Sequence, residues 1–284
     1  MIELPETYVL AEQINRTLVG KTVLNATANA SPHKFAWFSG DPAGYQQKLA
    51  GKTITSANPG TGYTCGGNTE IVCGNMLLVI STPIKYHAPG EKLPPKHQLW
   101  LEFEDFSGDG TSSMTCTVQM WGAMLCYQRD QNGLPQSYKV NKAPTPLMDE
   151  FDKPYFEKLF SNTAPNLSAK AFLATEQRIP GLGNGVLQDI LFNAKIHPKT
   201  KLEKLTDGEI EGLYKSTKET LFAMTAQGGR DTERDLFGCP GGYKTILSAN
   251  TIDNPCPVCG DKIVREAYLG GNIYYCPTCQ PWKK

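Results

Sequence analysis

The hydrophobic pattern of this chain changes near residue 128, and this change limits the possible folds more than any other feature. Residues 21–127 contain short β-branched and apolar runs, such as EIVCGNMLLVIST and HQLWLEFEDF, separated by Gly, Pro, Asn and Asp. Such runs are typical of an antiparallel β-sandwich. Residues 155–226 instead place apolar side chains at helical spacing. The sequence therefore predicts an α+β multidomain chain.

The ends of these two regions give the domain boundaries. Leu10, Ile14 and Leu18 lie at helical spacing, so residues 3–19 are expected to form a helix that ends near Gly20. Paired turn residues and prolines mark a linker after the sandwich. We expect the following division: an N-terminal helix and β-sandwich over 1–127, a linker over 128–150, a helical domain over 151–248 and a zinc finger over 249–284.

Composition excludes several classes of protein. The 284 residues are 40% hydrophobic and 20% charged, which excludes long disorder, and 28 basic residues balance 28 acidic ones. Any contact with DNA must therefore come from a local basic face. The start MIELPETYVLAEQ lacks the positive charge and apolar run of a signal peptide, and no apolar run reaches about 18 residues. We expect a cytosolic monomer with no membrane partner.

Two Cys-x2-Cys pairs near the C-terminus have the spacing of a four-cysteine zinc finger. Sixteen residues separate the pairs, enough for a hairpin, and each pair can direct two thiolates at one structural Zn²⁺. The four predicted ligands are Cys256, Cys259, Cys276 and Cys279. Two interpretations remain open: the metal only holds a short tail together, or the hairpin tip, near Gly270 and Gly271, also meets DNA. A small local excess of Lys and Arg favours the second interpretation weakly.

The other five cysteines lack the spacing of a disulfide framework. In a reducing compartment they are expected to be buried thiols. These residues are Cys65, Cys73, Cys116, Cys126 and Cys239.

The segment RIPGLGNGVLQDILFNAKIHP places a glycine-rich turn between one helix that ends near Arg178 and another that begins around Asn184. Such a turn can present backbone N–H groups and the start of a helix to a phosphate. It can equally be an ordinary helix end, with a C-cap at Gly181 or Gly183 and an N-cap at Asn184.

Three motifs together resemble the formamidopyrimidine-DNA glycosylase and endonuclease VIII family of base-excision repair enzymes. They are the MxELPE start, the PGLGN turn, and the CPxC and CPxCQ pairs, and their order spans nearly the whole chain. The resemblance implies a helix-two-turn-helix domain and double-stranded DNA with a damaged base or abasic site as partner. By resemblance, Glu3 acts on the sugar of the damaged nucleotide, Glu6 is a second acidic residue of the site, and Asn184 holds the phosphate. From spacing alone, a helix-terminal carboxylate is the preferred interpretation of Glu3, and the resemblance reverses that preference.

The chain departs from that family at four functional positions. Ile2 stands where the family has the N-terminal proline nucleophile, so the amine of Met1 or Ile2 would have to act instead. The segment NPGTGY lacks the family's lysine, and Gly271 replaces the finger arginine, which leaves Arg265, Lys283 and Lys284 as substitutes. In TVQMWG, Trp121 is expected to be either a stacking wedge or a core residue.

The loop GGRDTERDLFGCPGGYK is expected to cover the extruded base, with contacts from Arg230, Arg234, Phe237 and Tyr243. The leading hypothesis is a DNA glycosylase with weakened or absent strand-nicking lyase chemistry. A non-catalytic binder of damaged or abasic DNA is the alternative, and a protein- or RNA-binding role is the third hypothesis. The nature of the lesion is left open.

Overall fold

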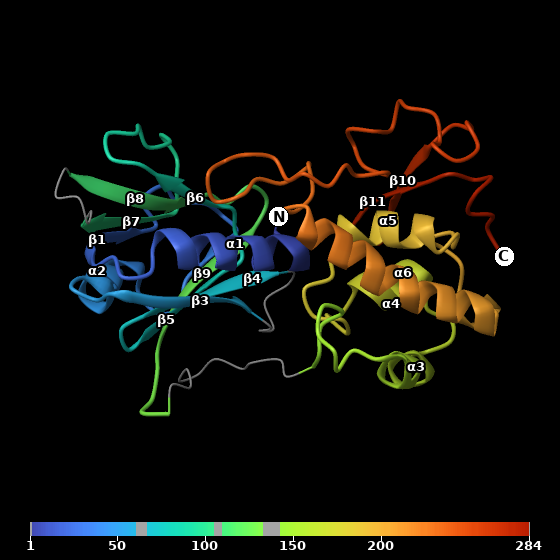
Figure 1. The fold of residues 1–284 in the computed structure, drawn as a ribbon, viewed down its shortest axis with the longest axis horizontal. Coiled ribbons are helices and arrows are strands. Elements are labelled where there is room, and N and C mark those ends of the chain that lie inside the picture. Colours follow the sequence, from blue (N-terminus) through green and yellow to red (C-terminus); the bar gives the residue numbers. More distant parts are fainter. Residues whose placement is uncertain (1, 61–66, 105–109, 133–142, 284) are drawn as a thin grey trace.

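The computed structural model describes residues 2–60, 67–104, 110–132 and 143–283. Two lobes lie side by side along the long axis, and the N-terminal helix α1 (Leu4–Thr17) runs from one to the other (Figure 1). This arrangement confirms the predicted fold class. Among the described residues, no helix is both long and apolar enough to cross a membrane.

The first lobe is a β-sandwich whose two sheets enclose the larger hydrophobic core. One sheet has the order β1-β7-β8-β6 and the other β2-β9-β5-β4-β3. Neighbouring strands are antiparallel except for β2 and β9. The strands are β1 (Val23–Ala28), β2 (Ala36–Trp37), β3 (Ile54–Gly60), β4 (Asn68–Cys73), β5 (Met76–Ile80), β6 (Ile84–His87), β7 (Leu99–Glu104), β8 (Thr111–Cys116) and β9 (Gly122–Gln128).

Several short elements of this lobe differ from the predicted strands. Strands β2 and β6, a single 3-10 turn (Pro42–Gly44) and the helix α2 (Tyr45–Leu49) were not predicted, because each is too short to carry a periodic pattern. Strand β8 ends at Cys116, although the apolar run continues to Trp121. Residues 117–121 instead connect β8 to β9.

The second lobe is helical, with its own apolar core. It comprises α3 (Lys153–Ser161), α4 (Ala169–Ala174), α5 (Val186–Asn193), a 3-10 turn (Leu202–Lys204) and α6 (Asp207–Ala226). Helix α4 ends four residues before the predicted boundary at Arg178. The reason is that Glu176 and Gln177 adopt left-handed backbone angles, with φ of 59° and 50°. The Gln177 side chain then accepts from the N–H of Gly181 and donates to the carbonyl of Leu182, which completes a turn between α4 and α5.

Helix α1 belongs to both lobes. Leu10 and Ile14 pack in the sandwich core, whereas Leu4 packs in the helical core. At its start, the backbone N–H of Glu3 donates to the Glu6 carboxylate over 3.0 Å, in a capping arrangement. The predicted helix over 3–19 is therefore confirmed within two residues at its C-terminal end. Because α1 spans the junction, its first turn lies between the lobes.

A loop that follows α6, residues 227–245, also joins the two lobes; we call it the bridging loop. Leu236 is buried in the sandwich core, and its carbonyl accepts from the N–H of Tyr86 in β6 over 2.7 Å. Gln13 of α1 donates to Asp235 over 3.0 Å. In Figure 1 this loop passes over the start of α1. It therefore closes one side of the junction between the lobes.

The C-terminal module is a hairpin of β10 (Val264–Tyr268) and β11 (Gly271–Tyr275) that lies against α5. Gln188 of α5 donates to the carbonyl of Asn272 and accepts from the N–H of Tyr274. The buried Gln280 donates to the carbonyl of Ile196 over 2.9 Å. The module is thus fixed to the helical lobe by buried side-chain amides, not only by apolar contact.

Three of the scattered cysteines, Cys73, Cys116 and Cys126, are buried, as expected. Cys239 is exposed instead, because it lies on the outer turn of the bridging loop, so its predicted burial was wrong. Cys65 lies outside the described residues.

Candidate functional site

The start of α1 meets the start of α5 at the junction between the lobes. Both oxygens of the Glu3 carboxylate accept backbone hydrogen bonds of 2.8 Å, one from Gly185 and one from Val186. These N–H groups belong to the first turn of α5, where the helix dipole also favours negative charge. Glu3 itself is buried. Its carboxylate is therefore held in a single position by the glycine-rich turn.

The glycines of that turn provide the space for this contact. A Cβ atom at Gly183 would lie 2.5 Å from the Glu3 carboxyl carbon, and one at Gly185 would lie 1.7 Å from Nη1 of Arg230. Both distances are shorter than real Cβ contacts. The sequence PGLGNG thus allows two charged groups to approach the backbone, which an ordinary helix cap does not require.

Arg230, from the bridging loop, forms a buried ion pair with Glu6. Its Nε lies 2.9 Å from Oε1 and its Nη2 2.7 Å from Oε2 of Glu6, while its Nη1 lies 3.6 Å from Oε2 of Glu3. Burial acts to raise the pKa of Glu6, but the charge and hydrogen bonds of Arg230 outweigh it, and the pKa of Glu6 is lowered. The pKa of Arg230 is raised by the same carboxylates. Paired in this way, both residues are fully charged.

This ion pair changes the interpretation of two residues. Arg230 was predicted to contact DNA, but it is 2% exposed, and its guanidinium faces protein carboxylates. The geometry assigns it to the interior of the junction instead of to a phosphate. The crevice that Glu6 lines has no space for a water molecule. Of the two predicted carboxylates, Glu3 lines the larger open space.

That open space is a cavity of about 250 Å³ between the start of α1, the turn before α5, the bridging loop and the finger. Pockets that hold small molecules begin at roughly 300 Å³, so the cavity is close to that size. Its lining combines charged, amide and hydroxyl side chains with a few apolar ones. The lining residues are Glu3, Asn184, Gly185, Gln188, Arg230, Thr232, Glu233, Thr245, Leu247, Ser248, Ala249 and Tyr274.

Asn184 connects the glycine-rich turn to the finger hairpin. Its Nδ2 donates to the carbonyl of Asn272 over 2.9 Å, and its Oδ1 is buried without a partner among the described residues. Of the two N–H groups of the amide, the one that donates to Asn272 therefore fixes the side chain on the finger. A Cβ atom at Gly271 would lie 3.3 Å from this amide. Position 271 thus adjoins Asn184, and a glycine there allows the finger backbone to approach closely.

The remaining predicted DNA contacts are spread over the surface and the core. Tyr243 is buried in the helical core and hydrogen-bonded to Asp189, and it also lines an open pocket beside α6, so its predicted contact with DNA stays a prediction. Arg234 and Arg265 are exposed, the latter on β10. Trp121 is half-buried, with its ring 5.9 Å from that of the exposed Trp37. Trp121 is therefore not a core residue, and the wedge interpretation stays a prediction.

Phe237 and Lys283, two further residues expected to contact DNA, both contact other parts of the protein. Phe237 of the bridging loop is exposed and packs edge-on against Tyr86, 6.2 Å between ring centroids, on the sandwich side of the loop. Lys283, one proposed substitute for the finger arginine, lies 2.6 Å from Glu209. Its charge is thus already neutralised by α6, and Lys284 lies outside the described residues.

Ile2 is completely buried in the sandwich core. The side chain of residue 2 therefore serves packing, and only a backbone amine at this position could act as a nucleophile. Met1 and residues 61–63 of NPGTGY lie outside the described residues.

Sequence reasoning missed three residues of interest. Glu233 was overlooked because it lies among other charged residues in a loop without periodicity. Gln188 has no sequence signal that separates it from a solvent-facing helix residue. Trp37 becomes relevant only because strand pairing brings β2 beside β9 and thus beside Trp121.

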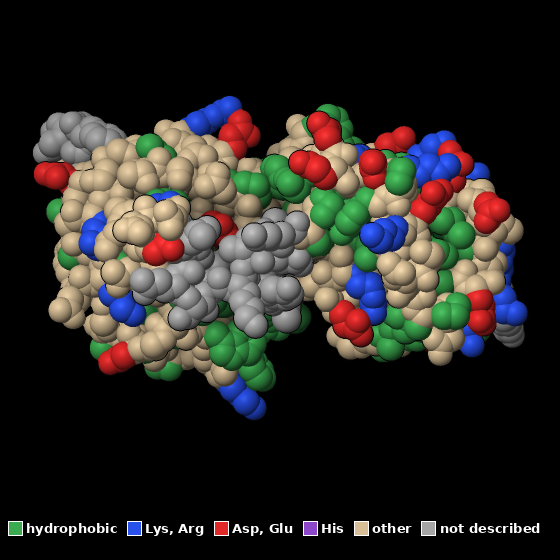
Figure 2. Space-filling view, turned by 90° about the horizontal axis from the view of Figure 1, so that it is seen from below, with side chains coloured by type: hydrophobic (Ala, Val, Ile, Leu, Met, Phe, Trp, Pro, Cys, Tyr) green, Lys and Arg blue, Asp and Glu red, His purple; other side chains and the backbone are tan. Residues whose placement is uncertain are grey.

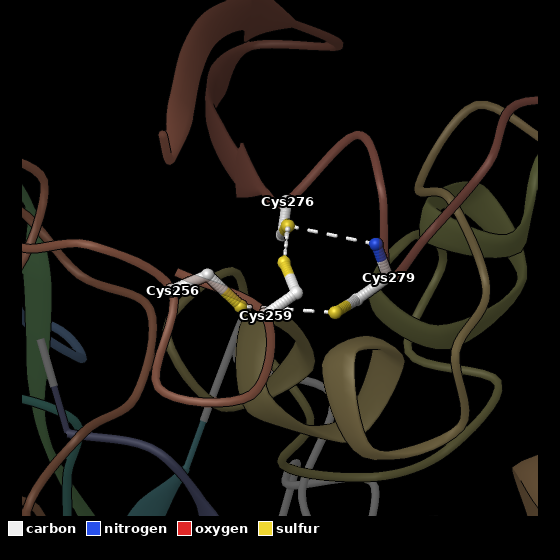
Figure 3. Close-up of side chains that lie close together, drawn as sticks. All are labelled: Cys256, Cys259, Cys276 and Cys279. Carbon is white, nitrogen blue, oxygen red and sulfur yellow. Dashed lines mark hydrogen bonds between the residues drawn. The ribbon is translucent and has the colours of Figure 1, made fainter. Parts of the chain in front are cut away.

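The four predicted metal ligands converge at the base of the finger (Figure 3). Their sulfur atoms all lie within 4.8 Å of one another, with Cys256–Cys279 at 3.7 Å and Cys259–Cys276 at 3.4 Å. Tetrahedral coordination with bonds of about 2.3 Å requires sulfur atoms roughly 3.8 Å apart. This donor set fits a metal ion that prefers four thiolates.

Comparison with known proteins agrees with this fold. Residues 143–234 match the family model of the formamidopyrimidine-DNA glycosylase H2TH domain. A formamidopyrimidine-DNA glycosylase of Lactobacillus delbrueckii subsp. bulgaricus is 26% identical over 287 residues, which cover 99% of each chain. A Legionella pneumophila protein of the same name is 33% identical over 177 residues, 61% of this chain and 63% of the relative.

Solved structures share the fold over nearly the full length. The Lactococcus lactis Fpg in complex with DNA containing an abasic site superimposes with a TM-score of 0.77 at 22% identity, covering 98% of this chain and 99% of that one. The MutM (Fpg) protein of Thermus thermophilus gives a TM-score of 0.74 at 21% identity, covering 99% and 100%.

The fold and the site define a helix-two-turn-helix protein with a four-cysteine finger and a polar cavity where its lobes meet. Over nearly its full length the chain is similar to proteins named formamidopyrimidine-DNA glycosylases, and the H2TH domain model of that family matches its residues 143–234.

Proposed function

We propose that this protein is a DNA glycosylase that hydrolyses the N-glycosidic bond of a damaged base in double-stranded DNA. The observation that carries this proposal is the position of Glu3. Its carboxylate is fixed by two backbone N–H groups at a cavity between the lobes, as a reacting group must be. Departure of a base leaves positive charge on the sugar, and a fixed carboxylate stabilises that charge.

The target nucleotide has to leave the base stack before it can reach such a cavity. We assign Asn184 to the phosphate beside it, through the amide N–H that is not bonded to Asn272. The curated relatives are named formamidopyrimidine-DNA glycosylases, and one similar structure holds DNA with an abasic site. These relatives support damaged or abasic DNA as the partner. We further propose that this DNA is double-stranded and that the protein acts as a monomer in the cytosol.

We further propose that the four cysteines hold one structural Zn²⁺. When bound, the ion would fold the finger and leave no open coordination position, so it would take no part in the reaction. Its four ligands would keep the hairpin tip, including Gly271, beside Asn184.

The strand-nicking lyase step is proposed to be weak or lost. A lyase of this kind needs an amine that attacks the sugar, and residue 2 is a buried isoleucine instead of the proline that the family resemblance implies. Near Asn184, Gly271 supplies no positive charge. The site therefore has fewer positive charges that could bind the phosphates of the abasic product than the family pattern implies.

A non-catalytic role in binding damaged DNA is the second candidate. The buried isoleucine at position 2, in place of a nucleophilic proline, favours it. Figure 2 shows the side of the molecule opposite the bridging loop and the finger. The acidic and basic side chains there are scattered among uncharged ones, and the described residues of that side form no continuous basic patch.

Base release and sodium borohydride trapping on duplexes with oxidised bases and abasic sites separate these candidates. The proposal predicts release of a free base with little or no trapped covalent adduct. Tight binding to a lesion duplex without base release from any lesion would establish the binding role instead. Strong trapping would contradict the loss of the lyase step, and it would leave the glycosylase step intact.

A further inference from the structure

A second carboxyl group lines the cavity besides Glu3. It is not Glu6, which Arg230 occupies, but Glu233 of the bridging loop. The Glu233 side chain is 16% exposed, and its Oε1 lies 4.0 Å from Nη2 of Arg230. The two carboxyl groups that share the cavity therefore come from opposite sides of the junction, α1 on one side and the bridging loop on the other.

The surroundings of these two carboxyl groups differ. Glu3 accepts two short backbone hydrogen bonds at the start of α5, which suits a carboxylate. The pKa of Glu233 is raised, chiefly by burial. Positive charge at the chain's N-terminus and on Arg230 opposes this rise, whereas Glu6 and Glu3 add to it. A carboxyl group that shares a cavity with a carboxylate fixed by hydrogen bonds, and whose own pKa is raised, is suited to donate a proton there.

We propose that Glu233 is the group that protonates the departing base, while Glu3 stabilises the sugar. This assignment rests on the glycosylase function proposed above. It adds a catalytic residue from the bridging loop, which lies far in sequence from the N-terminal motif that contains Glu3 and Glu6.

The step balances as a hydrolysis. The bond between sugar C1′ and the base nitrogen breaks, and its electron pair goes to the base. The Glu233 carboxyl transfers its proton to a ring nitrogen or carbonyl oxygen of the base, which leaves neutral. A water oxygen then bonds to C1′, and the proton that this water releases restores the Glu233 carboxyl. No oxidant, reductant or metal ion enters the step.

This role limits the substrate class. Proton donation helps most when the base is a poor leaving group, and least when ring substituents already stabilise its anion. The cavity should therefore accept damaged bases that need protonation at an atom facing the bridging loop.

The test is single-turnover base release by the full-length protein and its Glu233→Gln variant, from pH 5 to 9. Two duplexes are compared: one carries a damaged pyrimidine, and the other its ring-halogenated analogue, a better leaving group. Exposed Glu219→Gln is the matched control, and thermal unfolding reports the fold of each variant. We expect wild-type release to decline as pH rises through the Glu233 pKa, a decline absent from Glu233→Gln. That variant should be slowed roughly a hundredfold or more on the poorer leaving group and far less on the analogue.

Other outcomes overturn the assignment. Equal slowing on both duplexes with an unchanged pH profile would indicate a purely structural contribution of Glu233. Wild-type rates in a folded Glu233→Gln variant would remove any role. Absence of base release from the wild-type protein on every lesion would instead refute the glycosylase function and, with it, this role for Glu233.

Discussion

At the scale of single residues, the site depends on a close fit between a glycine and a buried arginine. The Gly185 backbone has φ −76° and ψ −50°, which alanine also adopts, so any cost of a side chain there is steric. The obstacle is Nη1 of Arg230, 1.7 Å from the position of the Cβ atom. The two residues should thus be energetically coupled.

Gly185→Ala is expected to lower the free energy of unfolding by about 1–3 kcal/mol, because the arginine has to move. In an Arg230→Ala background the same substitution should cost much less. Urea unfolding of the wild type, the two single variants and the double variant measures the coupling energy between the two positions. Gly212→Ala in α6 is the matched control: no atom lies within 4 Å of its Cβ, and it should be stabilising by about 0.5–1 kcal/mol. Additive effects of the two substitutions would contradict the contact.

Removal of the arginine charge should be costly for a different reason. Arg230→Met leaves the buried Glu6 carboxylate without its partner, and a broken buried ion pair costs about 3–5 kcal/mol. Arg234→Met, four residues further along the same loop but exposed, should change stability little. Chemical denaturation compares the two variants. Equal stability of both would refute a buried role for Arg230.

The sequence predicted the residues of this site unevenly. Glu3, Glu6 and Asn184 came from a resemblance between short motifs, and the four cysteines from spacing alone. The role of Arg230 could not be predicted, because its partner Glu6 lies 224 positions away in sequence. A charged residue in a glycine-rich loop is normally exposed to solvent. For this reason Arg230 was predicted to contact DNA and not a buried carboxylate.

At the scale of elements, the docking of the finger on the helical lobe should depend on pH. His197 lies between the rings of Tyr275 and Trp282, with centroids 4.3 and 5.6 Å away. Burial, and then the charge of Lys199, lower its pKa from 6.5 to about 4. The unfolded chain therefore binds a proton at a higher pH than the folded one, and stability falls as pH drops from 6.5 towards 4.

His197→Phe keeps an aromatic ring and removes the titration. We expect its free energy of unfolding to vary less between pH 7 and pH 4 than that of the wild-type protein. Urea unfolding at each pH, followed by tryptophan emission, provides the comparison. An identical pH dependence in both proteins would contradict this role of His197.

Longer elements were predicted well and short ones poorly. Helices α1 and α6 carry several turns of periodic apolar residues, and the range predicted for α1, 3–19, differs from the structure by only one or two residues at each end. Helix α4 ended early because two consecutive residues adopt left-handed angles, which no propensity indicates for Glu and Gln. The two-residue strand β2 depends wholly on pairing with β9, a tertiary contact.

At the scale of the whole molecule, the four-cysteine cluster should control whether the finger hairpin stays beside the cavity. Removal of the metal by a chelator, or Cys276→Ser, is expected to expose the amides of 264–275 to hydrogen exchange while the β-sandwich stays protected. Lesion-duplex affinity should fall in parallel. Cys239→Ser, an exposed cysteine outside the cluster, is the control. Unchanged exchange after chelation would show that buried amides alone hold the hairpin.

The division into two lobes and a finger followed from the sequence, because each part has its own pattern. The cavity could not be predicted from the sequence, because it exists only where α1, the turn before α5 and the bridging loop meet.

The most direct test of the proposed function is single-turnover base release by wild-type protein, Glu3→Gln and the exposed Glu12→Gln control on a damaged-base duplex. We predict release by the wild type and the control, and loss of release in Glu3→Gln with duplex binding retained. Equal release by all three proteins would contradict the central role of Glu3.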